Sequence, residues 1–463
     1  MSTKCSRLDA ALKFANESID DSLARLFEFM QIKSVSTDPA FSTEIESAAN
    51  WLKEELFNLG IESSVHQTSG HPIVYGRSDG RSTSPRVLFY GHYDVQPADP
   101  EDEWESSPFE PKLIDVGGAP CIYGRGASDD KGQLMTFIEA LRALRAVSGD
   151  FPCPVTFLIE GEEECGSPSL APFLLQNKSR LDCDLLMACD TDMLDDGTPA
   201  ITASLRGLAQ VEMTITGPSR DLHSGGYGGP AWNPLRVLTK ILGGLHDDSG
   251  RVLIPAFYDG VDSSTSSEIY SQELCGIGDE LLRSVGLKSA AGEKGYSILD
   301  QVWRRPTAEI NGIWGGYTGV GTKTVIPSAA HAKISFRLVG RQDPETVVSA
   351  FRQFVIGQLP PDCKAKFEVG TGCPPFEFPS DSGALQKVSL ALRTEWGRPT
   401  IFIGNGGSIP VVTHFRSILK KDALLVGFAH DDDQVHSPDE RYRLESFRKG
   451  IRSWIRILDA ICT

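Results

Sequence analysis

Hydrophobic residues recur along this chain in two patterns, which predict alternating helices and buried strands. Apolar side chains at helical spacing predict helices over residues 12–32 and 47–59 and after residue 132. Short continuous apolar runs at 87–90, 155–159, 184–189 and 423–428 predict strands that are buried on both faces. Helices that alternate with such strands are typical of α/β proteins, so we expect a mixed, mostly parallel sheet flanked by helices.

The pattern changes near residue 206, where apolar and polar residues begin to alternate. Alternation over 208–215 and 331–338 predicts strands with one exposed face, and helices are expected at 233–245 and 344–359. The earlier pattern resumes after residue 381. We therefore expect a first domain made of residues 1–205 and 381–463, interrupted by an inserted α+β domain at 206–380.

A cluster of carboxylates follows the strand predicted at 155–159. Glu160 and Glu162–Glu164 come directly after the apolar run, and Gly166 closes the turn. Carboxylates this close repel one another unless a cation lies among them or one keeps its proton. With a metal ion, one glutamate would bind the cation while its neighbour acts as general base on a water molecule. The alternative is a solvated acidic loop.

Potential metal ligands follow other predicted strands as well. His92 and Asp94 lie two residues apart after the strand at 87–90, so both side chains face the same side. His92 could bind a metal through one ring nitrogen while Asp94 orients the ring. The alternative is a purely structural histidine. Asp190 follows the run at 184–189, and His436 follows the run at 423–428. Because open α/β sheets place active sites at strand ends, we interpret these residues as parts of one site.

Two other interpretations of the loops fail on their spacing. The glycines at 124 and 126 suggest a phosphate loop, but the third glycine and the Gly-Lys-Ser/Thr sequence are missing, whereas the paired Asp129 and Asp130 suit a cation. The acidic run 431–433 lacks the glycine and glutamate of a calcium-binding loop.

Composition narrows the class of protein further. The 463 residues carry a formal net charge of −17 without a basic cluster, which argues against a nucleic-acid partner. No apolar run is long enough to span a bilayer, and the N-terminus lacks the apolar core of a signal peptide, so we expect no membrane partner and a cytoplasmic location. The ten cysteines form no Cys-x-x-Cys pair and are expected to be reduced thiols.

The ordered set of motifs closely resembles the co-catalytic zinc metallopeptidase family of aminoacylases, succinyl-diaminopimelate desuccinylase, glutamate carboxypeptidase and carnosinase-type dipeptidases. The matching segments are Gly-His-Tyr-Asp-Val at 91–95, 124–132, 162–167, Asp190, Asp-Leu-His-Ser-Gly at 221–225 and His436. The long insertion in the second domain, together with 315–318 and 324–327, resembles the dipeptidase branch in particular.

The resemblance implies a site with two metal ions. In it, Asp129 bridges both ions, the first of which also binds His92 and Asp190, and the second Glu164 and His436. Glu163 would be the general base and Asp94 would orient His92, and the family also has a cis peptide at the position of Asp129–Asp130. The expected ions are Zn²⁺, although Mn²⁺ or Co²⁺ would suit the same ligands.

The resemblance also assigns a role to the inserted domain, as a lid and dimerisation domain of a homodimer. His223 resembles the histidine that reaches the partner subunit's site and stabilises the oxyanion, and Thr324, Arg337 and Ser408 resemble residues that bind the substrate, including its carboxylate. Without the resemblance, His223 would be interpreted as an exposed loop histidine.

The expected function is hydrolysis of the amide bond of a dipeptide, or of a similar small substrate with a free carboxylate. The alternative enzyme is an N-acyl amino acid deacylase or desuccinylase, which differs in what lies on the amino side of the cleaved bond. A non-catalytic metal-binding homologue is the alternative of another class, and the presence of Glu163 beside a complete ligand set argues against it.

Overall fold

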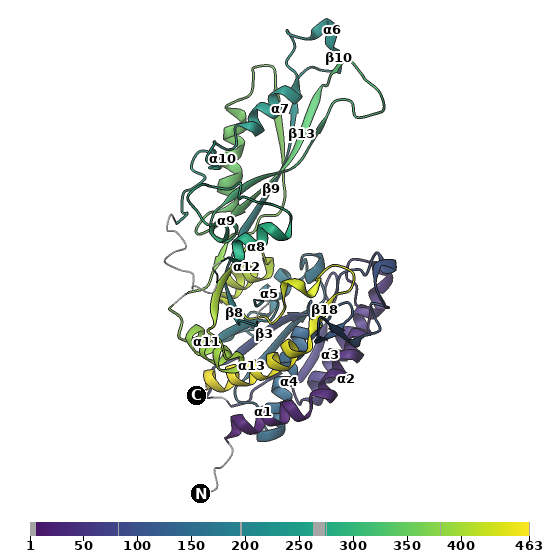
Figure 1. Cartoon of the computed structure of the whole chain (residues 1–463), viewed down its shortest axis with the longest axis vertical. Helices are drawn as coiled ribbons and strands as arrows, with labels where there is room; N and C mark the ends of the chain where they lie inside the picture. The colour runs from purple at the N-terminus through teal and green to yellow at the C-terminus, as the bar shows by residue number, and fades with distance from the viewer. Residues whose placement is uncertain are drawn as a thin grey trace. The chain divides into compact units, whose positions relative to one another are not determined.

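The computed structural model describes residues 6–81, 83–194, 197–262, 274, 276–379 and 381–462. The chain forms two compact units (Figure 1). The first comprises Met1–Ala203, Phe378–Ile403 and Pro410–Thr463, and the second comprises Ser204–Glu377 and Gly404–Ile409. The expected boundary at 205/206 lies two residues from this division, and residue 380 of the other expected boundary lies outside the described residues. The short segment that contains Ser408 belongs to the second unit.

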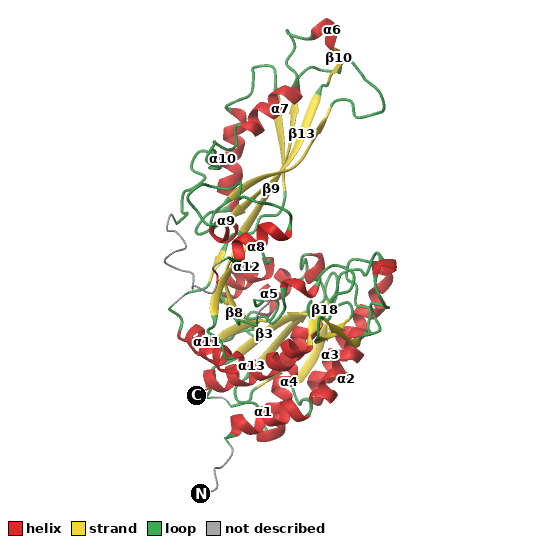
Figure 2. Ribbon diagram, viewed as in Figure 1, coloured by secondary structure: helices red, strands yellow, loops and turns green. Residues whose placement is uncertain are grey.

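The first unit is built from helices and a mixed sheet (Figure 2). Its elements are α1 (Arg7–Glu17), α2 (Ile19–Met30), α3 (Ser42–Asn58), β1 (Glu62–His66), β2 (Ile73–Ser78), β3 (Val87–His92), β4 (Lys112–Val116), β5 (Ala119–Tyr123), α4 (Lys131–Ser148), β6 (Val155–Glu160), the 3₁₀ helix η3 (Glu163–Cys165), α5 (Leu170–Asn177), β7 (Leu185–Ala188), α11 (Gly383–Trp396), α12 (Pro410–His414), the π-helical turn η6 (Phe415–Leu419), β17 (Ala423–Leu425), the 3₁₀ helix η7 (Asp431–Asp433), β18 (Arg441–Arg443) and α13 (Leu444–Cys462). Strands β8 (Ala200–Leu205) and β16 (Ile401–Asn405) continue from this unit into the second.

The main sheet has a parallel centre with antiparallel strands on both sides, in the order β1-β2-β6-β3-β7-β17-β8. Strands β6, β3, β7 and β17 are parallel, so their carboxyl ends meet at one edge. Strands β6 and β3 are fully buried, as the continuous apolar runs predict. The predicted fold class, a mixed and mostly parallel sheet flanked by helices, is confirmed.

Helices cover both faces of this sheet. On one face, the ring of Phe89 in β3 stacks on Phe137 of α4 at 3.8 Å between ring centroids and meets Trp454 of α13 edge-on at 5.7 Å. On the other face, the next residue, Tyr90, packs against Phe415 at 5.1 Å. A smaller sheet in the order β18-β5-β4 lies in the same unit and pairs Arg441 with Tyr123.

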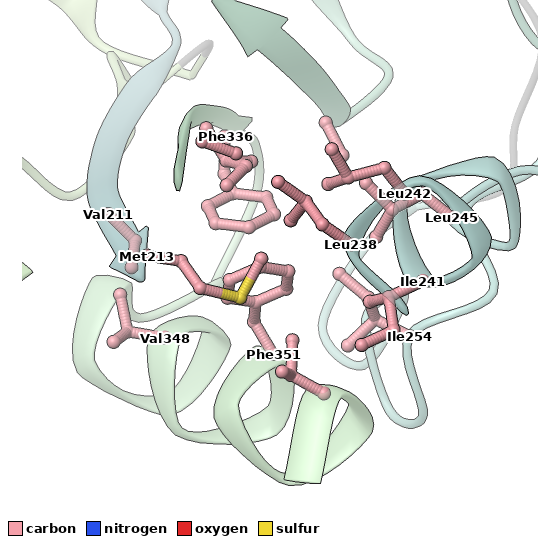
Figure 3. Packing of buried hydrophobic residues seen from close by; sticks show 14 of the residues in the cluster. Val211, Met213, Leu238, Ile241, Leu242, Leu245, Ile254, Phe336, Val348 and Phe351 are labelled. Atoms are coloured by element: carbon pink, nitrogen blue, oxygen red, sulfur yellow. The ribbon is translucent and has the colours of Figure 1, made fainter. Parts of the chain in front are cut away.

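The second unit is a four-stranded antiparallel sheet packed against helices. Its elements are β9 (Gly207–Thr216), β10 (Leu222–His223), α6 (Ser224–Tyr227), α7 (Pro234–Gly243), α8 (Ile277–Ser284), α9 (Ile298–Trp303), β11 (Thr307–Gly315), β12 (Val325–Ile326), β13 (Ala329–Leu338), α10 (Pro344–Ile356), β14 (Lys364–Val369) and β15 (Phe376–Glu377). The sheet order is β11-β13-β9-β14, and β9 buries every second residue. Figure 3 shows its inward side chains, such as Met213 and Phe336, pointing toward Leu238 of α7 and Phe351 of α10.

Two further findings concern the whole chain. Among the residues that the structure describes, no helix is both long and apolar enough to cross a membrane. The eight described cysteines are free thiols.

Candidate metal centre

His92 ends β3 at the edge where the parallel strands finish. It pairs in register with Glu160 at the end of β6, and its side chain is completely buried. The ring Nδ1 lies 3.1 Å from the carbonyl oxygen of Asp94 and 3.4 Å from its Oδ1. These contacts fix the ring, and they leave Nε2 as the nitrogen that faces the site.

Asp94 also holds the glutamate turn in place. Its Oδ1 accepts a hydrogen bond from the amide of Glu163 at 3.3 Å, and its Oδ2 accepts one from the amide of Glu164 at 3.0 Å. One buried carboxylate therefore fixes both the ring of His92 and the backbone of η3, which carries the two glutamates.

Asp129 lies between two histidines that come from distant parts of the chain. Its Oδ1 is 3.1 Å from Nε2 of His92, and its Oδ2 is 2.9 Å from Nε2 of His436. The peptide between Asp129 and Asp130 is cis, as the family resemblance led us to expect. Each oxygen of this carboxylate thus faces a different histidine, which is the geometry of a bridging ligand.

The five residues predicted as metal ligands come together in two groups that share Asp129. His92, Asp129 and Asp190 form one group, and Asp129, Glu164 and His436 form the other, with the ligand atoms of each group within 4.8 Å of one another. Glu163 belongs to neither group. That these groups bind metal ions stays a prediction.

Two buried atoms favour cations at this place. Among the described residues, Nε2 of His92 and Oε1 of Glu164 have no hydrogen-bond partner. Nε2 of His92 lies 3.1 Å from Oδ1 of Asp129, and with Asp190 these atoms are close enough to bind one cation together. Such an arrangement fits two ligands that converge on a third atom, and a set of imidazole and carboxylate groups fits a divalent metal ion.

The carboxyl group of Glu163 has a raised pKa. Burial raises the pKa of its carboxyl group to about 7; the positive charge of His92 works against this shift, and the carboxylates of Asp129 and Glu164 add to it. A carboxyl group with a pKa near neutrality can both accept and donate a proton at ordinary pH.

His223 and Thr324 lie together in the second unit. Strand β10 pairs with β12, and the amide of Ser224 donates to the carbonyl oxygen of Thr324 at 3.0 Å. His223 is exposed, and its Nδ1 accepts a hydrogen bond from the amide of Gly225 at 2.9 Å. The ring is thereby oriented, and its Nε2 is the nitrogen left for a ligand.

Arg337 and Ser408 form a second pair in that unit. Nη1 of Arg337 donates to Oγ of Ser408 at 3.1 Å, and Oγ of Ser408 donates to the carbonyl oxygen of Arg206 at 2.5 Å. The side chain of Arg206 also donates to the carbonyl oxygen of Gly406 at 3.0 Å, so the turn that carries Ser408 is held from two sides. Burial and the neighbouring Arg337 lower the pKa of Arg206 to about 10.

The two pairs lie at opposite ends of the second unit. Asp221, just before β10, accepts from the amide of Ser328, the residue before β13, and Figure 1 shows β10 and α6 at that end. Arg337 is the penultimate residue of β13, whose ten residues span about 30 Å. His223 and Arg337 of one chain are therefore too far apart to contact the same small substrate.

The comparison with known families agrees with this geometry. Residues 88–460 match the model of peptidase family M20/M25/M40. The chain belongs to this family. The predicted relationship, including the likeness to dipeptidases, is confirmed.

Relatives of this M20 peptidase share most of its length. The chain is 32% identical over 466 residues to the Cys-Gly metallodipeptidase dug1 of Schizosaccharomyces pombe, with 96% of each protein covered. It is 32% identical over 387 residues to human Beta-Ala-His dipeptidase, with 82% of this chain and 76% of the relative covered. Among solved structures, an M20 family metallo-carboxypeptidase from Sulfolobus solfataricus superposes with a TM-score of 0.79 at 30% identity, covering 96% of this chain and 99% of the other.

Two residues that contact the candidate ligands or their loops, Gln96 and Glu440, were missed by sequence reasoning. Gln96 donates to Oε2 of Glu164 at 2.8 Å, and the buried Glu440 accepts hydrogen bonds from the loop that precedes Asp129. Glu440 lies four residues after His436, but its position in the sequence does not reveal which loop it contacts.

Proposed function

We propose that this M20 peptidase is a metal-dependent dipeptidase that hydrolyses the amide bond of a dipeptide with a free carboxylate. Relatives that share about a third of its residues are named as dipeptidases for Cys-Gly and Beta-Ala-His. The observation that carries the proposal is Asp129, whose two oxygens face two separate ligand groups. Glu163 belongs to neither group but interacts with the charges of His92, Asp129 and Glu164.

Five side chains hold the metal in this proposal. His92, Asp129 and Asp190 form one site, and Asp129, Glu164 and His436 form the other. We propose two ions per chain, with zinc as the working metal. When bound, these ions would polarise the amide carbonyl and make the attacking water more acidic.

The proton transfers fall to Glu163. It takes a proton from the water as the water attacks the amide carbon, and then gives this proton to the leaving amine. Its pKa of about 7 suits both steps. Asp94 keeps the backbone of Glu163 and the ring of His92 in fixed positions throughout.

Substrate recognition falls to the second unit. We assign the carboxylate of the substrate to Arg337 and Ser408, because a guanidinium and a hydroxyl together can donate several hydrogen bonds to one carboxylate. Arg206 supports this pair through the carbonyl oxygens of residues 206 and 406. His223 would donate to the oxyanion that forms on the amide carbonyl, with Thr324 beside it in contact with the substrate.

The separation of His223 from Arg337 leads us to propose that the working form is a homodimer. If both residues contact one substrate, they must come from different chains. Strand β11 offers an edge for pairing, since it is the outermost strand of its sheet and exposes Ile310, Ile313 and Trp314. The opposite edge, β14, carries the charged residues Lys364, Lys366 and Glu368 and suits solvent better. A cytoplasmic location stays a prediction.

The test is hydrolysis of matched substrates by protein reconstituted with Zn²⁺, Mn²⁺ or Co²⁺. Free dipeptides such as Cys-Gly and Beta-Ala-His are compared with their N-acetylated and N-succinylated forms. Turnover of the free dipeptides alone, abolished by a chelator, is the expected result. Turnover of only the acylated forms would replace the proposal with a deacylase, and turnover of neither would favour a non-catalytic role.

A further inference from the structure

Two loops that meet at the metal centre are joined by carboxylates outside the ligand set. The first loop, 124–129, follows β5 and ends at Asp129, and the second loop, 430–440, contains His436 and leads into β18. Strands β5 and β18 pair antiparallel, with Arg441 opposite Tyr123, so both loops leave the same end of this small sheet.

Glu440 holds the first loop through four hydrogen bonds. Its side chain is completely buried. Oε2 accepts from Nη1 of Arg125 at 2.8 Å and from the amide of Gly126 at 2.9 Å, and Oε1 accepts from the amides of Ser128 at 2.9 Å and Asp129 at 3.1 Å. Every donor to this carboxylate comes from the loop that presents Asp129. A buried carboxylate with this many donors fixes the backbone that it binds.

Asp433 adds a second link between the same loops. It is buried, unlike Asp431 and Asp432 of the same acidic run. Its Oδ2 accepts from Oγ of Ser128 at 2.8 Å and from the amide of His430 at 2.9 Å. The two buried carboxylates therefore lie three residues before His436 and four residues after it, and both bind Ser128, the residue before Asp129.

The backbone of the second loop needs such support. Gln434, His436 and Asp439 have φ angles of 58°, 62° and 61°, in the left-handed region that residues other than glycine rarely adopt. A loop with three such residues keeps its shape only where surrounding contacts hold it. His436 itself is exposed, so packing around its own side chain does not fix it.

We propose that Glu440, assisted by Asp433, is a positioning residue that sets the distance between Asp129 and His436 and thereby the affinity for the cation held by Asp129, Glu164 and His436. This inference rests on the proposed metal site. In this proposal Glu440 does not contact the cation; it acts by holding the amide of Asp129 and the backbone of the loop.

The test is a two-site Co²⁺ titration of the full-length apoprotein, monitored through the visible absorption of bound cobalt. Competition with Zn²⁺ gives a second measurement of the two affinities. Glu440→Gln keeps the shape of the side chain but replaces one acceptor oxygen by a donor, which must then face N–H groups. We expect binding at one of the two sites to weaken about 10- to 100-fold and the cobalt spectrum to change, while excess Zn²⁺ restores turnover.

A matched control separates positioning from stability. Glu139 is another buried carboxylate held by arginine and serine donors, and it lies in α4, outside the metal groups. Glu139→Gln should lower the thermal midpoint and leave both cobalt affinities unchanged. If Glu440→Gln lowers only the thermal midpoint, with affinities and spectrum as in the wild type, the positioning role is overturned.

A milder variant covers the case in which Glu440→Gln fails to fold. Ser128→Ala removes the hydroxyl that binds Asp433 and leaves every charge in place. A weakening of a few-fold at the same site is expected, whereas unchanged cobalt affinities in Ser128→Ala would remove Asp433 from the proposal. Glu440→Asp keeps the charge but shortens the side chain by one methylene, so unchanged cobalt affinities in that variant would refute the role of Glu440 itself. If the wild type binds neither Co²⁺ nor Zn²⁺, the metal site of the proposed function fails. If the wild type binds two ions and the cobalt affinities of the variants are unchanged, only the positioning role fails.

Discussion

At the scale of single residues, the adjacent glutamates 163 and 164 have different surroundings. Oε2 of Glu164 lies 3.3 Å from Nε2 of His436 and accepts from Gln96, whereas Glu163 belongs to no ligand group and has a pKa near 7. Glu163→Ala should therefore lower turnover at least about 100-fold while the protein still binds two metal ions. Metal analysis beside kinetics checks this, with Glu164→Ala as the control that should lose metal. Loss of metal from Glu163→Ala would mean that the two roles are exchanged.

Arg337 permits a second test with a matched change in the substrate. Arg337→Ala should lower kcat/KM for a dipeptide about 10- to 100-fold, because a charge-assisted contact to the carboxylate is lost. A dipeptide whose terminal carboxylate is replaced by a carboxamide should be a poor substrate for the wild type, and its kcat/KM should fall little further in the variant. Equal losses on both substrates would place Arg337 away from the carboxylate.

Residues that the sequence could and could not reveal differ in one physical respect. His92 and Asp190 could be predicted as candidates because each follows a continuous apolar run, so its place at a strand end follows from local pattern. Glu440 and Ser128 are separated by more than 300 positions, and they meet only because β18 pairs with β5. Their contact depends on the tertiary structure, which a local sequence pattern does not predict.

At the scale of elements, the helix predicted at 12–32 consists of two helices that meet at Ser18. The amide and Oγ of Ser18 both donate to the carbonyl oxygen of Phe14, and its backbone leaves the helical region. The apolar pattern continues across this break because α1 and α2 both pack against α4. The sequence did not predict the strand order either. Strand β6 lies between β2 and β3, and a buried apolar run does not indicate which strands it pairs with.

Packing between α2 and α4 includes an ion pair whose strength should depend on pH. Glu139 accepts from Arg25 at 2.8 and 2.6 Å and also pairs with Arg142 at 3.2 Å. Burial would raise its pKa, but Arg25 and Arg142 outweigh burial and lower it. A lowered pKa in the folded state gives stability that is present above the unfolded value of about 4.5 and is lost as the pH falls through the folded value.

Glu139→Gln should consequently lower the free energy of unfolding by about 2 kcal/mol or more near pH 7, because two arginines lose their carboxylate partner. The difference in thermal midpoint between wild type and variant should shrink as the pH falls below the unfolded pKa. Calorimetry of both metal-free proteins over a pH series checks this. A difference that stays constant into the acidic range would show that the carboxylate charge contributes nothing.

At the scale of the whole molecule, the arrangement of the second unit makes one chain insufficient for the proposed site. Its sheet separates His223 and Thr324 at one end from Arg337 and Ser408 at the other. The sequence could indicate all four residues through family resemblance, but it could not reveal this separation. The distance depends on the length and register of β13, and it turns the expected homodimer into a geometric requirement of the proposal.

Mixing two inactive variants tests this requirement. In a heterodimer of His223→Ala and Glu163→Ala chains, one centre would have an intact Glu163 and receive an intact His223 from the other chain, while the second centre would lack both. Random exchange of subunits should then restore about a quarter of wild-type activity from two proteins that are each nearly inactive. Mixing either variant with an inactive Glu163→Ala, His223→Ala double variant is the control, and it should restore nothing. If the first mixture also stays inactive although light scattering and exchange of labelled subunits show heterodimers, His223 acts within its own chain or outside the reaction, and the argument from β13 fails.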